Sequence, residues 1–154
     1  MITFKPTTDV DLVRDTLMSP NNLPWQFEDG FNREGLRCMK ALPAGFTYVA
    51  AYCDSAYVGI FLVINKEPHV ECHLALLPLA YGMSSLILYA FVEWIWANTD
   101  SELIQAPVVE DNRLAGMMAE KSGFKKAARR PHAWLKDGIN HDLIVYEIVK
   151  PIIG

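Results

Sequence analysis

The chain has 154 residues, of which 51% are hydrophobic and 11% aromatic, so it suits one domain whose core needs no disulfide or metal. The net charge of −4, with both signs interspersed, argues against a dedicated nucleic-acid surface. Cys38, Cys53 and Cys72 form no CxxC pair, which predicts reduced thiols and no structural zinc in a single cytoplasmic domain over residues 1–154.

The first part of the chain predicts one strand and two helices. Residues 2–5 alternate between apolar and polar types, as in a strand. They do not resemble a signal peptide, because no apolar stretch follows a charged head. Asp9 is suited to cap a helix that continues to about residue 18. A second short helix is expected over residues 32–41, ending before Pro43.

Three strands are expected next, over residues 46–53, 57–64 and 69–77. The first two are separated by a short turn at Asp54 and Ser55, so they should form an antiparallel hairpin. Pro78 ends the third strand.

The second half of the chain begins with a strongly apolar helix. This helix contains Glu93 and is too short to cross a bilayer, so we expect it to be buried and predict no contact with a membrane. A strand, a helix and a final hairpin of two strands should follow. The expected ranges are 83–97 for the apolar helix, 103–108 for the strand, 112–121 for the helix, and 124–135 and 142–149 for the hairpin.

Two segments carry recognisable motifs. Residues 77–86 join a strand to the apolar helix, and their sequence is Leu-Pro-Leu-Ala-Tyr-Gly-Met-Ser-Ser-Leu. A helix start offers unpaired N–H groups and a positive dipole end, which suit an anion. The other segment has Asn112-Arg113-Leu114-Ala115 followed by Glu120-Lys121-Ser122-Gly123-Phe124.

With the order of the elements, these motifs resemble the GNAT (Gcn5-related N-acetyltransferase) superfamily over residues 46–149. The resemblance implies an α+β fold with a mixed, mostly antiparallel sheet of about seven strands and about four flanking helices. It also implies acetyl-CoA as cofactor and a small-molecule or peptide amine as acceptor. Among relatives, the chain is similar to small phage-encoded members and to phage head-assembly proteins of the P22 type, which would imply a virion assembly partner.

The resemblance assigns the cofactor to the end of the fourth strand, the turn after it and the start of the helix expected over residues 112–121. The chain departs from the family pattern at three positions. Tyr81 replaces an arginine, Leu86 replaces a small residue, and Ala119 stands where many relatives carry a tyrosine that protonates the leaving thiolate. The residues implied to bind the cofactor are Leu76, Leu77, Gly82, Met83, Ser84, Ser85 and Asn112.

Glu71 and His73 are the candidate catalytic residues. They are two residues apart, so on a strand their side chains point to the same face. If that face lines the cleft, the pair can remove a proton from an amine. The other interpretation places both on the solvated face of the sheet, or His73 in a satisfied, half-buried position.

Aromatic residues leave two further questions open. Trp25 and Phe27 lie in a loop that would suit an acceptor with an apolar or aromatic part, or that docks onto the core. Trp94 and Trp96 point to different faces of one helix, so either the chain covers both or one of them forms a homodimer contact.

Two functions from different classes follow. The first is an N-acyltransferase that moves an acetyl group from acetyl-CoA to an amine. The second is a GNAT-fold protein without catalysis, with a role in phage assembly or regulation, and the three departures favour it. Fold similarity alone does not separate the two.

Overall fold

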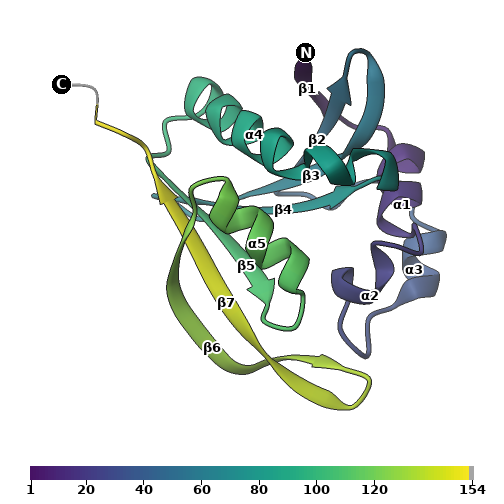
Figure 1. Ribbon diagram of the computed structural model, residues 1–154. Coiled ribbons are helices and arrows are strands. Elements are labelled where there is room, and N and C mark those ends of the chain that lie inside the picture. The colour runs from purple at the N-terminus through teal and green to yellow at the C-terminus, as the bar shows by residue number, and fades with distance from the viewer. Residues whose placement is uncertain (153–154) are drawn as a thin grey trace.

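A mixed seven-stranded sheet organises the chain (Figure 1). The computed structural model describes residues 1–152, apart from the side chains of residues 23 and 24, so residues 153 and 154 of the predicted domain lie outside the described residues. The strand order is β1-β2-β3-β4-β5-β7-β6, and neighbouring strands are antiparallel except for the parallel pair β4 and β5. The elements in chain order are β1 (Ile2–Thr7), α1 (Val10–Leu17), α2 (Leu23–Gln26), α3 (Arg33–Arg37), β2 (Phe46–Cys53), β3 (Ala56–Asn65), β4 (Val70–Leu76), the 3-10 helix η1 (Pro78–Met83), α4 (Ser84–Asn98), β5 (Leu103–Val109), α5 (Arg113–Lys121), β6 (Lys125–Lys136) and β7 (Ile139–Val149).

The predicted fold class is confirmed, and the seven expected strands are all present. Local signals account for this agreement. Asp9 caps α1 by accepting a hydrogen bond from the Leu12 N–H at 3.1 Å, and Asn112 caps α5 through the Ala115 N–H. The hairpin of β2 and β3 is antiparallel, as its short turn predicts.

Three elements differ most from the expectation, while other boundaries differ by one or two residues. The second helix was expected over residues 32–41, but α3 covers only Arg33–Arg37, where a single buried residue, Leu36, anchors it to the core. The single turn α2 was not expected, because four residues are too few to show a helical period. β7 begins at Ile139, three residues early, because Asp137 and Gly138 form a two-residue turn with φ of 52° and 75°.

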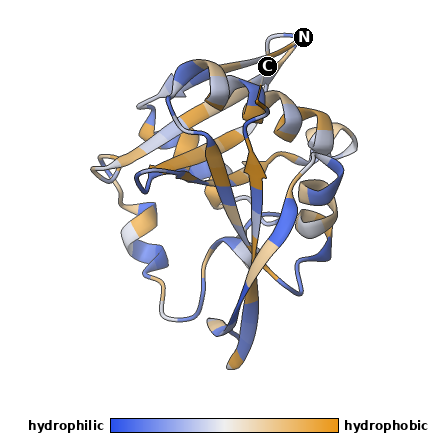
Figure 2. Cartoon of the chain, turned by 90° about the vertical axis from the view of Figure 1, so that its left-hand side faces the viewer, coloured by the Kyte–Doolittle hydropathy of each residue, from blue (hydrophilic) through white to orange (hydrophobic). Residues whose placement is uncertain are grey.

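Helices cover both faces of the sheet. On one face, α4 and α5 pack against the larger core cluster, in which the rings of Phe61 and Phe91 stack at 3.8 Å. On the other face, α1 packs Val13 against β2, β3 and β4, and α2 and α3 lie beside it (Figure 1). Figure 2 shows the hydrophobic colour concentrated in the central strands between these layers.

The apolar helix α4 packs as a core helix. By length and composition alone, Pro78–Asn98 would be long and apolar enough to cross a membrane. In the fold, however, α4 buries Ile87, Phe91 and Ile95 against the sheet. Trp94 lies beside Phe4 of β1, with ring centroids 6.4 Å apart, so contacts within the chain account for this aromatic side chain.

β4 and β5 separate soon after they meet. Their parallel pairing consists of Val70 with Ile104 and Glu71 with Gln105. Beyond these residues, β5 continues beside β7 up to Val109, while β4 runs on toward η1. The separation leaves one edge of β4 without a strand partner, and this edge positions the candidate site.

Replacing Gly59 with alanine tests how closely β3 approaches β4. A Cβ at Gly59 would lie 2.7 Å from the carbonyl oxygen of Ala75 and 2.9 Å from the Cα of Leu76. Because both are backbone atoms, β4 would have to shift. We expect Gly59→Ala to lower the free energy of unfolding by about 1–3 kcal/mol in urea denaturation. Gly82→Ala is the control, because nothing lies within 4 Å of its added Cβ, and equal stability of the two variants would contradict this close approach.

Candidate active site

A cleft opens where β4 and β5 separate. Its volume is about 720 Å³, within the range of roughly 300–1,000 Å³ that is usual for ligand sites. Its walls are β4 and β5, the first turn of α4 and the inner side of α5. The hydroxyl of Ser122 at the end of α5 donates to the Ser85 carbonyl at 3.1 Å, so it ties the start of α4 to α5.

The free edge of β4 presents carbonyl oxygens to this cleft. The N–H of Leu77 donates to β3 at 2.9 Å, and backbone groups alternate in direction along a strand, so the carbonyls of Leu76 and Leu74 point away from β3. Side-chain amides from the α2 region occupy both. Asn22 donates to the Leu76 carbonyl and Gln26 to the Leu74 carbonyl, each at 3.1 Å. This edge of β4 is therefore a row of backbone carbonyls that accept hydrogen bonds from side-chain amide N–H groups.

The turn before α4 is open to solvent. Gly82 has free space around it, and Ser84 and Ser85 line the cleft. Tyr81 is 47% exposed and lies at the cleft wall. Leu86 is 62% exposed and is not among the residues that line the cleft, so its side chain does not occupy the cleft.

The residues expected to bind a cofactor divide into two groups. Leu76, Ser84, Ser85 and Asn112 line the cleft, and the side chain of Asn112 also caps α5. The cleft lining does not include Leu77, Gly82 and Met83. The N–H of Leu77 bonds to β3 and its carbonyl accepts from Ala80, so both of its backbone groups are already engaged. Cofactor binding by these seven residues stays a prediction.

Glu71 and His73 form a hydrogen-bonded pair on one face of β4. His73 Nε2 lies 2.8 Å from Glu71 Oε2, and their side chains are 37% and 16% exposed. A carboxylate can only accept, so Nε2 carries the hydrogen and the lone pair of the neutral ring is on Nδ1. The hydrogen bond from His73 holds the pKa of Glu71 below its ordinary value, against the opposing effect of burial. The pair is thus neither fully solvated nor fully buried.

A second, apolar pocket lies on the face of the sheet covered by α1, α2 and α3. Its volume is about 490 Å³. Gln26, His73 and Leu74 line both this pocket and the cleft. His73 therefore lies in the wall that separates the two cavities, so a molecule bound in either cavity can contact this candidate base.

Cys72 also lines the cleft but is not suited to act as a nucleophile. It is almost fully buried, and burial raises the pKa of its thiol to about 12. Because it precedes His73 on the strand, its side chain points to the opposite face. The histidine therefore has no geometry for activating this thiol.

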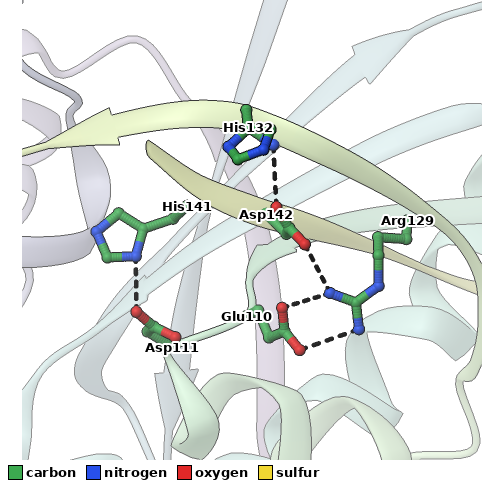
Figure 3. Close-up of polar contacts among 6 residues, drawn as sticks. All are labelled: Glu110, Asp111, Arg129, His132, His141 and Asp142. Atoms are coloured by element: carbon green, nitrogen blue, oxygen red, sulfur yellow. Dashed lines mark hydrogen bonds and ion pairs between the residues drawn. The ribbon is translucent and has the colours of Figure 1, made fainter. Parts of the chain in front are cut away.

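Polar contacts hold the long hairpin of β6 and β7, which contributes Trp134 and Leu143 to the cleft wall (Figure 3). Arg129 on β6 forms hydrogen bonds to Glu110, which follows β5, and to Asp142 on β7, at 3.0 and 2.8 Å. The backbone N–H of His132 donates to Asp142 at 2.9 Å, and this bond and Arg129 hold the pKa of Asp142 below its ordinary value. These groups fix the bulge in β6 against β7.

The hairpin meets α2 through aromatic rings. The Trp25 ring lies 6.0 Å from Trp134 and 6.2 Å from His141, measured between centroids. His141 is only 13% exposed and its Nδ1 lies 2.6 Å from a carboxylate oxygen of Asp111 (Figure 3). Sequence alone did not single out this cluster, because its members come from three distant segments. Trp25 thus docks onto the hairpin, whereas Phe27 lines the apolar pocket.

Comparison with known proteins places the fold. No family model matches the chain, and no curated protein matches it in sequence. Among solved structures, it is similar to a spermidine N-acetyltransferase from Vibrio cholerae in complex with CoA and spermine, with a TM-score of 0.77, 13% identity, and coverage of 97% of this chain and 95% of that chain. An aminoglycoside N(6')acetyltransferase from Legionella pneumophila has a TM-score of 0.74 and 17% identity, with coverage of 96% of this chain and 91% of that chain. A ribosomal-protein-S5-alanine acetyltransferase from Vibrio fischeri has a TM-score of 0.74 and 14% identity, with coverage of 97% of this chain and 93% of that chain. The chain has the GNAT fold.

The Glu71–His73 pair predicts a pH-dependent stability difference. The pKa of Glu71 is lowered from 4.5 in the folded state, so its contribution to stability is present above that value and is lost as the pH falls through the lowered pKa. We expect Glu71→Gln to be less stable than the parent protein by about 1 kcal/mol at neutral pH, because a charge-assisted hydrogen bond is weakened. In urea denaturation the difference should shrink toward zero as the pH falls through the lowered pKa of Glu71. Glu67→Gln, at an exposed loop position, is the control, and a difference that stays constant with pH would contradict the pairing.

Proposed function

We propose that the protein transfers an acetyl group from acetyl-CoA to the nitrogen of an amine. The observation that carries this proposal is the position of His73, which lines both the cleft and the apolar pocket while Glu71 holds its ring. The cleft would take the acyl donor and the pocket the acceptor. The acetyltransferases with the same fold support the reaction class.

Two features of the cleft fit acetyl-CoA. The carbonyls of Leu74 and Leu76 face the cleft in a row, and amide N–H groups of the pantetheine arm can replace the side-chain amides that bond them now. At Gly82 there is room for a phosphate to approach the backbone at the N-terminal end of α4, where the helix dipole favours an anion.

His73 and Glu71 would supply the proton chemistry. Acetyl-CoA, when bound, supplies the acetyl group as a thioester, whose C–S bond breaks as the C–N bond to the amine forms. His73 would take the proton that the amine must lose on its free Nδ1, because Nε2 donates to Glu71. Glu71 would keep the ring in this tautomer and stabilise its protonated form. Ala119 offers no proton, so the thiolate would take one from water.

One observation favours the second function, that of a GNAT-fold protein without catalysis that acts in assembly or regulation. Residues 77–98 contain no lysine, arginine or histidine, so the turn lacks the side-chain charge that would hold the phosphates of CoA. Tyr81 stands at the position where the charge would lie. In this case the partner would be a virion component or a second copy of the chain.

Binding of acetyl-CoA separates the two functions. If the protein is a transferase, acetyl-CoA at one hundred times its dissociation constant should stabilise it by about 2.7 kcal/mol, which a thermal-shift measurement detects. No shift at millimolar acetyl-CoA would overturn the proposal and favour the second function.

His73→Ala and Glu71→Gln test the roles of the pair in turnover. Loss of a general base typically lowers the rate by about 10²–10⁴-fold, so we expect His73→Ala to release CoA thiol that much more slowly and Glu71→Gln to be affected less. Both variants should still bind acetyl-CoA. His132→Ala is the matched control, because this histidine is exposed and its contact with Asp142 is made by its backbone. Equal rates in all three variants would remove the pair from the mechanism.

Gln26 tests whether the β4 carbonyls bind acetyl-CoA. Its side-chain amide donates to the Leu74 carbonyl, so it would compete with acetyl-CoA for this acceptor. We expect Gln26→Ala to tighten acetyl-CoA binding by roughly fivefold in calorimetry, since a hydrogen bond contributes about 1 kcal/mol. Gln105→Ala is the control, because it also loses one side-chain hydrogen bond, to Glu147, but lies outside the cleft lining. Weaker binding by Gln26→Ala would contradict the competition.

A further inference from the structure

The apolar pocket has a composition that restricts the amine it can take. Among the described residues that line it, there is no aspartate, glutamate, lysine or arginine. Burial raises the pKa of Tyr48, so this side chain is neutral at physiological pH. Most of the wall is aliphatic or aromatic, as in Phe27, Phe31, Leu36, Phe46, Ile60 and Leu62.

This wall cannot pair several positive charges. A charge placed against an apolar surface loses hydration and gains no partner, which costs several kcal/mol. Glu71 does not line the pocket and reaches its wall through its hydrogen bond to His73. The pair can therefore balance a single ammonium at the junction with the cleft, and the rest of the pocket favours an uncharged body.

An aromatic platform stands at the side of the pocket. The rings of Phe27 and Phe31 stack with centroids 3.9 Å apart and planes 15° apart, and Phe31 remains 44% exposed. The loop that carries them is tied to the hairpin of β6 and β7, where the carboxylate of Asp29 accepts from the N–H groups of Asp137 and Gly138 at 3.0 and 2.8 Å. The platform is thus held in place by contacts outside the pocket.

We infer that the acceptor is a primary amine with one positive charge and an aromatic or branched aliphatic body. The body would fill the apolar pocket against Phe27 and Phe31, and the nitrogen would lie at His73, where pocket and cleft share a wall. This excludes polycations such as the spermine bound by the structurally similar Vibrio cholerae enzyme. The inference rests on the proposed function, because that function makes this pocket the acceptor site.

Direct binding tests the inference without the donor. We expect 2-phenylethylamine to bind at least tenfold more tightly than spermine in calorimetry, since burial of one aromatic ring is worth about that much. Phe31→Ala should weaken binding of 2-phenylethylamine several-fold, because it removes half of the platform. Leu79→Ala is the matched control, as it removes an exposed apolar side chain outside both cavities, and it should bind like the parent protein.

The outcomes for the acceptor and for the reaction are separable. Equal or tighter binding of spermine, or unchanged binding by Phe31→Ala, overturns the inference on the acceptor. If acetyl-CoA is consumed with spermine but not with 2-phenylethylamine, the proposed function holds and the inference fails. If 2-phenylethylamine binds in the pocket but acetyl-CoA gives neither a thermal shift nor turnover, the pocket chemistry holds and the proposed function fails.

Discussion

The early separation of β4 from β5 is the constraint on which the candidate site depends. In a fully paired sheet, the carbonyls of Leu74 and Leu76 would bond to the next strand. Here only two residue pairs join the strands, and β5 continues beside β7 instead. An unpaired buried carbonyl is costly, so the edge must find other donors. Asn22 and Gln26 meet that demand, which explains why the segment around α2 lies against the cleft.

The same separation explains why the site is assembled from distant parts of the chain. The cleft needs a far wall, and the hairpin of β6 and β7 supplies it through Trp134 and Leu143. Arg129 and Asp142 hold that hairpin, but the side chain of Arg129 is half-exposed, so its ion pair with Asp142 adds little to stability. Their effect is mainly geometric, because they fix a bulged strand that would otherwise have several registers.

The sequence predicted the elements well because their signals are local. The apolar period, the capping residue Asp9 and the two-residue turn in the first hairpin each act within a few positions. The site was only partly predictable. Side-chain alternation placed Glu71 and His73 on one face, but it does not reveal that His73 lies between two cavities. The sequence also identifies Leu86 as a departure from the family pattern, but it does not reveal that this side chain is 62% exposed on α4.

Two of the departures from the family pattern, Tyr81 and Ala119, bear on different quantities. In the proposed transfer, a missing charge at Tyr81 would weaken the binding of phosphates that lie far from the reacting atoms, and such contacts are equally strong in the ground state and the transition state. Their loss would therefore lower the affinity for the donor and leave the chemical step almost unchanged. Ala119 concerns the departing thiolate, and a thiol with an ordinary pKa of about 8.5 leaves readily without an acid beside it. The amine is different, because it must lose a proton before or as it attacks, and water is a poor base at neutral pH. In the proposed transfer, the demand for a protein group therefore falls on the acceptor side, where Glu71 and His73 lie.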